Sequence, residues 1–184
     1  MSLVFVALSY LASVNAARLR ILLPQEPTTG KVRFDAVVGG SVAILAVALV
    51  MSGGARSLLD ALSITDEMWR IATGLIVIAA GLRYVAFPAT GEEPALGGRL
   101  SALVPVAFPL LLTPELFVLT VAFTVDESVG LAMAGVAIAF GVLLFISLVR
   151  RGSRPERWLA GARFHAALLV VVGVAIVIEG IRDV

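Results

Sequence analysis

Glu115 is the residue whose position most requires a chemical explanation. It lies near the middle of an apolar segment, Leu103 to Val125, that is long enough to cross a bilayer, and it directly follows Thr113 and Pro114. An ionised side chain at the centre of a bilayer costs about 2.5–3.5 kcal/mol on insertion scales, so such acids usually face the bundle interior and a partner. Three roles are open to Glu115: it binds a substrate amine or a coupling cation, it carries a proton, or it pairs with a basic residue as a structural tie.

Other polar residues in apolar segments bear on these roles. Arg18 and Arg83 are the candidates for an ion pair with Glu115, because both lie on the inner halves of their segments. Asn15 interrupts the first segment at the corresponding place, and its amide suits either a structural tie or a ligand contact. Pro114 removes a backbone donor, and Thr113 is expected mainly to cap the carbonyl groups freed beside it, with contact to a solute as the alternative. The candidate substrate-binding residues are Asn15, Thr113, Pro114 and Glu115.

Catalysis has little support in the sequence. The chain has no cysteine and one histidine, His165, which excludes disulfides, thiolate nucleophiles and cysteine-bound zinc and leaves no plausible imidazole metal site. The common phosphate-binding, serine-hydrolase and zinc-protease motifs are missing. We therefore expect no enzyme activity, no cofactor and no metal site. The formal net charge of +1 provides no basic field, so we expect no nucleic-acid partner.

The composition predicts the elements that must position these residues. Of the 184 residues, 60% are hydrophobic and 15% are charged, whereas soluble domains average about 45–50% and about 25%. Six apolar segments approach the roughly 20 residues that a spanning helix needs. They are Leu3 to Leu23, Phe34 to Met51, Trp69 to Phe87, Leu103 to Val125, Val129 to Val149 and Trp158 to Ile181. We expect an all-α membrane protein with six transmembrane helices in a single domain, residues 1–184.

The basic residues predict how these helices are oriented. Eleven of the 14 Lys and Arg residues lie near the first, third and fifth loops, and the other three are Arg56, Arg70 and Arg182. Because basic loops stay in the cytoplasm, both termini are expected to be extracytoplasmic. The basic cluster from Arg150 to Arg157 is interpreted mainly as a topology signal beside anionic lipid, with a specific lipid or partner site as the alternative.

The six segments divide into two triplets that resemble one another. The third segment begins RIATGLIVIAAGLRYV at Arg70, the sixth contains RFHAALLVVVGVAIVIEGI from Arg163, and each closes its triplet. A unit of three crossings reverses direction, so two such units form an inverted repeat, an architecture in which many transporters bind substrate between interrupted helices. We expect two inverted three-helix repeats, residues 1–88 and 101–184, with the site between the first and fourth helices.

Several of these motifs resemble the MarC family of six-helix bacterial inner-membrane proteins, within the superfamily of LysE-type amino-acid exporters. The resemblance lies in the break at Asn15, in Ser57 to Val85, in AFPLLLTPELF from Ala107 to Phe117, and in the ending Gly180-Ile181. Members typically have Asn-Pro in the first helix and a Gly-Pro-Gly-like break in the fourth, whereas this chain has Asn-Ala and Thr-Pro-Glu. The resemblance implies small-solute transport, with small neutral amino acids as one substrate class.

Two functions remain open on these grounds. The first is a membrane transporter or exporter of a small polar metabolite, with cation or proton coupling through Glu115. The alternative is a non-transporting subunit or scaffold of a larger membrane complex, in which Glu115 is a structural tie. Either function has the lipid bilayer as its surroundings, and pairs of small residues such as Gly39 and Ala43 suit close helix packing within one chain or in a homo-oligomer.

Overall fold

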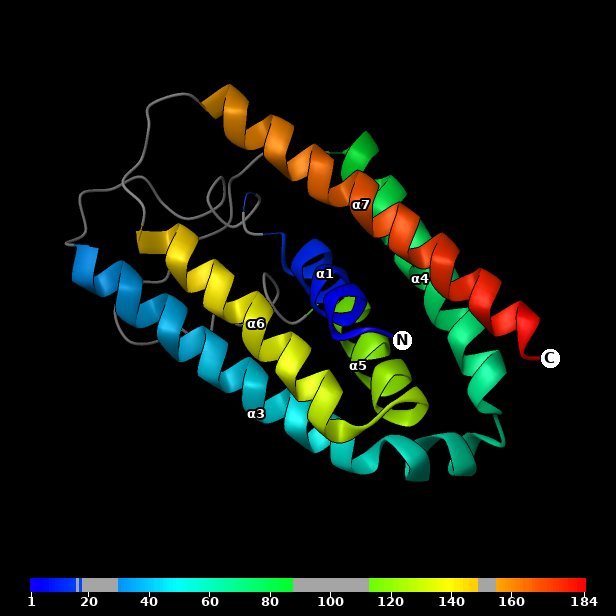
Figure 1. Cartoon of the computed structure of the whole chain (residues 1–184). Coiled ribbons are helices and arrows are strands. Elements are labelled where there is room, and N and C mark those ends of the chain that lie inside the picture. The colour runs from blue at the N-terminus through cyan, green and yellow to red at the C-terminus, as the bar shows by residue number, and fades with distance from the viewer. Residues whose placement is uncertain (16, 18–29, 88–112, 149–154) are drawn as a thin grey trace.

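The computed structural model describes residues 1–15, 17, 30–87, 113–148 and 155–184, and these residues form helices without any β-strand. The helices are α1 (Leu3–Val14), α3 (Gly30–Leu62), α4 (Asp66–Ala86), α5 (Pro114–Asp126), α6 (Val129–Leu148) and α7 (Pro155–Arg182). Figure 1 shows the short helices α1 and α5 lying between two pairs of long helices, α3 with α6 and α4 with α7. The fold is therefore all-α, with its shortest helices at the centre.

Local hydrogen bonds explain where the helices begin. The hydroxyl groups of Ser2, Thr65 and Thr113 each accept a hydrogen bond from the backbone N–H three residues later, at 3.3 Å. Such caps satisfy one of the backbone donors that the first turn of a helix leaves without a partner. At the other end of α1, Asn15 has a left-handed backbone with φ of 42°, which stops the helix. Asparagine tolerates this conformation better than most residues do.

Four helical segments are long and apolar enough to cross a membrane: Val38–Leu62, Asp66–Ala86, Val129–Ile146 and Glu156–Arg182. Large apolar side chains on them point away from the protein, among them Val50, Phe145 and Phe164, which are each more than two-thirds exposed. Such faces suit a lipid environment rather than water. These helices indicate that the chain is a membrane protein. The described residues contain four candidate membrane spans, whereas the sequence predicted six.

Three predicted segments differ from the helices that form. The first was expected to run from Leu3 to Leu23, but α1 ends at Val14, and residues 18–23 lie outside the described residues. The second segment was expected to end at Met51, but α3 continues to Leu62 because Ala55 and Leu59 are buried against α5. The described part of the fourth segment is α5, whose 13 residues span only about 20 Å at 1.5 Å per residue, less than a bilayer core of about 30 Å. Residues 103–112 of that segment lie outside the described residues.

Close backbone contact joins α4 to α7, the most extensive helix pair. A Cβ atom added at Gly74 would lie 2.7 Å from the carbonyl oxygen of Gly173, and one added at Gly173 would lie 2.8 Å from the carbonyl oxygen of Gly74. Gly81 approaches the carbonyl oxygen of Ala166 in the same way. Only glycine leaves room for helices this close, so α4 and α7 form one tightly packed antiparallel pair.

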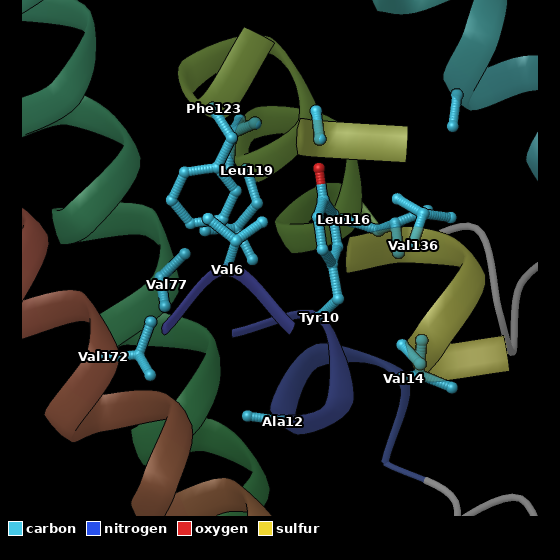
Figure 2. Packing of buried hydrophobic residues seen from close by; sticks show 14 of the residues in the cluster. Val6, Tyr10, Ala12, Val14, Val77, Leu116, Leu119, Phe123, Val136 and Val172 are labelled. Carbon is cyan, nitrogen blue, oxygen red and sulfur yellow. The ribbon is translucent and has the colours of Figure 1, made fainter. Parts of the chain in front are cut away.

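The centre of the bundle is formed by α1 and α5. Ten of the 13 residues of α5 are buried, so protein surrounds this helix on nearly every side. Figure 2 shows Tyr10 of α1 beside Leu116, Leu119 and Phe123 of α5, and the rings of Tyr10 and Phe123 meet edge to face with centroids 5.6 Å apart. This packing positions the ends of the two short helices, where the polar residues lie.

Candidate functional site

The two helix breaks predicted from the sequence lie at the same level of the bundle. Helices α1 and α5 run antiparallel, since the hydroxyl of Tyr10 donates a hydrogen bond to Thr120 Oγ1 at 3.3 Å while Phe5, one turn earlier, contacts Phe123 further along α5. Asn15 lies five residues after Tyr10 in α1, and Glu115 lies five residues before Thr120 in α5. Because the two helices run antiparallel, both positions lie about 7.5 Å from the Tyr10–Thr120 contact in the same direction along the bundle. The break after α1 and the start of α5 are therefore neighbours in depth.

Asn15 joins this break to α7. Its side chain is buried, and its Nδ2 atom donates a hydrogen bond to the backbone carbonyl of Ala162 at 3.1 Å. Its own backbone N–H donates to the carbonyl of Leu11, which completes the last turn of α1. Asn15 thus has a structural role at the end of α1, and the structure places it beside the start of α5 in depth.

Thr113 and Pro114 start α5. Thr113 is buried in an extended conformation, and its hydroxyl accepts the hydrogen bond from the N–H of Leu116. It thus caps the N-terminal donors of α5, whereas the sequence had suggested that it caps carbonyl groups beside Pro114. Pro114 occupies the first helical position, where its missing N–H breaks no intrahelical hydrogen bond. The proline therefore occupies the first position of α5, directly after Thr113. Residues 103–112 of the fourth segment lie outside the described residues.

Glu115 lies in the first turn of α5, buried with 3% of its surface exposed. Its Oε2 atom has no hydrogen-bond partner among the described residues. A carboxylate near a helix N-terminus interacts favourably with the helix dipole, which contributes about 0.3–1 kcal/mol. That contribution is small against the cost of burying a charge, so the dipole alone does not account for an acid at this position.

The ion pair considered for Glu115 is not among those between described residues. Arg83 is exposed in the last turn of α4, where a basic side chain suits the negative end of the helix dipole. Arg18, the other candidate, lies outside the described residues. The buried carboxyl of Glu115 therefore follows Thr113 and Pro114 in the chain and lies at a similar depth to Asn15, and it is not paired with Arg83.

Sequence reasoning missed a second polar cluster, at the end of the bundle where α3 meets α4 and α5 meets α6. Arg70 Nη2 lies 2.8 Å from Asp126 Oδ1, and Arg70 also pairs with Asp183. The side chains of Arg70 and Asp126 are only 12% and 6% exposed. The sequence shows that these charges flank apolar segments, but it does not show that helix docking buries two of them. We call this cluster, with Arg56 and Asp66, the charged end.

Buried hydroxyl groups also line α5 on the side opposite Glu115. Thr120 Oγ1 donates to the carbonyl of Leu116 at 2.7 Å, and Thr124 Oγ1 donates to Ser52 Oγ at 2.9 Å. Thr113, Thr120 and Thr124 follow one helix face, because they are seven and four residues apart. The sequence signal was present as this spacing within an apolar helix, but a threonine face is more often structural than functional in membrane helices.

The described residues contain no group of three or more His, Asp or Glu side chains arranged to hold a metal ion. Among the described residues, the break region offers one buried carboxyl group, whose Oε2 atom has no partner among them, near the ends of two short helices. Such a group binds a positive charge or exchanges a proton.

No protein-family model, curated protein or solved structure matches the chain significantly. The resemblance to the MarC family therefore remains an expectation based on the motifs.

Proposed function

We propose that the chain is a membrane transporter or exporter of a small polar metabolite, with small neutral amino acids as one substrate class and a cation or proton coupled through Glu115. The observation that carries the proposal is the buried carboxyl of Glu115, whose Oε2 atom has no partner among the described residues. Buried acids in membrane helices without a structural partner usually mark ion or substrate pathways. Asn15, Thr113 and Pro114 would complete the binding region.

The helix breaks support this proposal. In secondary transporters, discontinuous helices place the polar ends of half-helices near the middle of the bilayer, at the substrate site. Here α1 stops at Asn15 and α5 starts at Pro114, and the antiparallel contact between them puts both ends at one level. From Asp126 at the charged end, Glu115 is 11 residues along α5, or about 16 Å. That is about half of the bilayer core.

An inverted repeat is also part of the proposal. Gly74 and Gly173, which meet at the centre of the α4–α7 contact, are 99 residues apart (173 − 74). The break residues Asn15 and Pro114 are separated by the same number (114 − 15). A constant offset close to 100 is what two repeats starting near residues 1 and 101 would produce. In this arrangement both termini face outward from a bacterial inner membrane.

The proposal is tested by flux of labelled solutes into proteoliposomes containing the purified chain. We expect uptake of at least one small amino acid or other small polar metabolite, and a loss of about tenfold or more with Glu115→Gln, which keeps the shape but removes the charge and the proton site. Glu179→Gln is the matched control, since Glu179 is a partly exposed acid near the end of α7. A tenfold change corresponds to about 1.4 kcal/mol.

Unchanged flux with Glu115→Gln would remove Glu115 from the mechanism. Folded protein that moves no solute from a broad panel would contradict transport itself. That second result would favour the alternative of a membrane subunit in which Glu115 has a structural role.

A further inference from the structure

We infer that Arg70 and Asp126 form a gate that closes the charged end of the same transport region, an inference that rests on the proposed function. The pair joins α4 to the last residue of α5, with 2.8 Å between Arg70 Nη2 and Asp126 Oδ1. It lies at the opposite end of α5 from Glu115.

One face of α5 connects the gate to the candidate site. Glu115, Leu119, Ala122 and Asp126 are four, seven and 11 residues apart, so they fall within about 60° around the helix axis at 100° per residue. Leu119 and Ala122 are buried with 0% and 2% exposed, and they separate the two acids with apolar side chains. Opening the charged end would therefore expose the face that leads to Glu115.

The interactions at this end divide the helices into two groups. Helix α5 is held to α3 by Arg56, whose Nη2 donates to the carbonyl of Val125 at 3.2 Å, and by the bond between Thr124 and Ser52. Helices α4 and α7 are joined by their glycine contacts. The Arg70–Asp126 pair crosses the boundary between these groups. Two weaker contacts cross it as well: Arg56 with Asp66 at 4.0 Å, and the hydrogen bond from Thr73 Oγ1 to the carbonyl of Val118 at 3.4 Å. Arg70 and Asp183 both belong to the α4–α7 group.

The chemistry of the pair suits a contact that opens and closes. A buried ion pair often contributes little net stability, because removing both charges from water offsets their attraction. This pair is also incompletely bonded, since Arg70 Nε and Asp126 Oδ2 have no partners among the described residues. When water enters, both groups can regain hydrogen bonds, which offsets part of the loss of their mutual attraction. A contact with two accessible states is what a gate requires.

The test uses thiol labelling, for which the chain is suited because it has no cysteine. Ala122→Cys places one thiol on the buried face of α5, directly below the pair, with a small change in volume. The rate of reaction with a membrane-impermeant maleimide is measured in proteoliposomes, without any solute. This readout does not depend on transport, so its failure and the failure of the proposed function are distinguishable.

We expect Ala122→Cys to react slowly, and about tenfold faster when Asp126→Asn or Arg70→Gln is added. Asp183→Asn is the matched control, since it removes a carboxylate from the same arginine without crossing the boundary, and we expect its rate to stay within about twofold of the parent. Tenfold corresponds to about 1.4 kcal/mol in the equilibrium between closed and open forms.

Two results would overturn the gate. One is an unchanged labelling rate with both Asp126→Asn and Arg70→Gln, and the other is an equal increase with Asp183→Asn, which would indicate general loosening. If Arg70→Gln does not fold, judged by gel filtration, Asp126→Asn alone decides. Solute flux in the wild type together with unchanged labelling would leave transport standing and remove the gate.

Discussion

At the scale of single residues, the structure gives Asn15 a local role that is independent of any ligand. Its left-handed backbone ends α1, and its side chain bonds to Ala162 on α7. The side-chain bond ties the end of α1 to a neighbouring helix. Thr113 instead caps its own helix, α5, because its hydroxyl accepts a hydrogen bond from the N–H of Leu116. Among the described residues, the candidate site is therefore positioned by these hydrogen bonds at the helix ends.

Substitutions at Asn15 separate the contribution of its left-handed backbone from that of its side-chain hydrogen bond to Ala162. Asn15→Gly keeps access to positive φ but loses the buried hydrogen bond, and we expect it to lower the free energy of unfolding by about 1 kcal/mol. Asn15→Ala adds backbone strain at φ of 42°, and we expect a loss of about 2 kcal/mol. Thermal unfolding in detergent measures both. Equal stability of the two variants would contradict a strained left-handed position.

These residues could be predicted from the sequence because polar side chains are rare in apolar segments, so Asn15, Thr113 and Glu115 stand out by type alone. The hydrogen-bond partners of these residues could not be predicted from the sequence, because Ala162, the partner of Asn15, is 147 residues away from it. The burial of Arg70 and Asp126 could not be predicted for the same reason: 56 residues separate them in the chain, and only the packing of their helices brings them together. Residue type predicts candidates, and tertiary packing decides their partners.

At the scale of elements, the spacing of small residues decides which helices approach closely. The glycines of α4 and α7 meet backbone to backbone, whereas Gly141 on α6 has open space around it. A sequence pattern of small residues indicates close packing but does not say which glycine provides it. The predicted spans were broadly right for α4, α6 and α7, because long apolar runs determine helices of that length. The end of α3 depended on its contact with α5 and was missed.

Alanine substitutions test this difference between glycines. In Gly74→Ala the new Cβ would lie 2.5 Å from Val177 Cγ2 and 2.7 Å from the carbonyl oxygen of Gly173, so the helices must separate. We expect a loss of about 1–3 kcal/mol in unfolding free energy, as for other overpacked cores. Gly141→Ala should instead be neutral or stabilising by up to about 1 kcal/mol, since alanine is the better helix former. Similar melting temperatures for both would contradict the α4–α7 packing.

At the scale of the whole molecule, the charged end fixes the relative direction of the helices. The short connections between α3 and α4 and between α5 and α6 both lie there, together with the ion pairs of Arg70. The distribution of basic residues predicted Arg56 and Arg70 on one side of the membrane, and the structure brings both to the charged end. The distribution of basic residues predicts which side of the membrane the charged end faces.

Cysteine labelling of intact cells tests that orientation. Ala61→Cys at the end of α3 and Ser128→Cys before α6 place exposed thiols at the charged end. Since the predicted topology puts this end outside the cytoplasm, we expect both thiols to react with an impermeant maleimide added to whole cells. Reaction only after cell lysis would invert the topology, and opposite behaviour of the two thiols would contradict the arrangement of the helices.

The central claim is that the carboxyl of Glu115 meets solute or protons inside the bundle. Dicyclohexylcarbodiimide, which reacts with protonated carboxyl groups in apolar surroundings, reports on this directly when the modified residue is located by mass spectrometry. We expect modification at Glu115, slowed by the solute that the chain transports and abolished by Glu115→Gln. An unmodified Glu115 in folded protein, or modification that no transported solute slows, would contradict the claim.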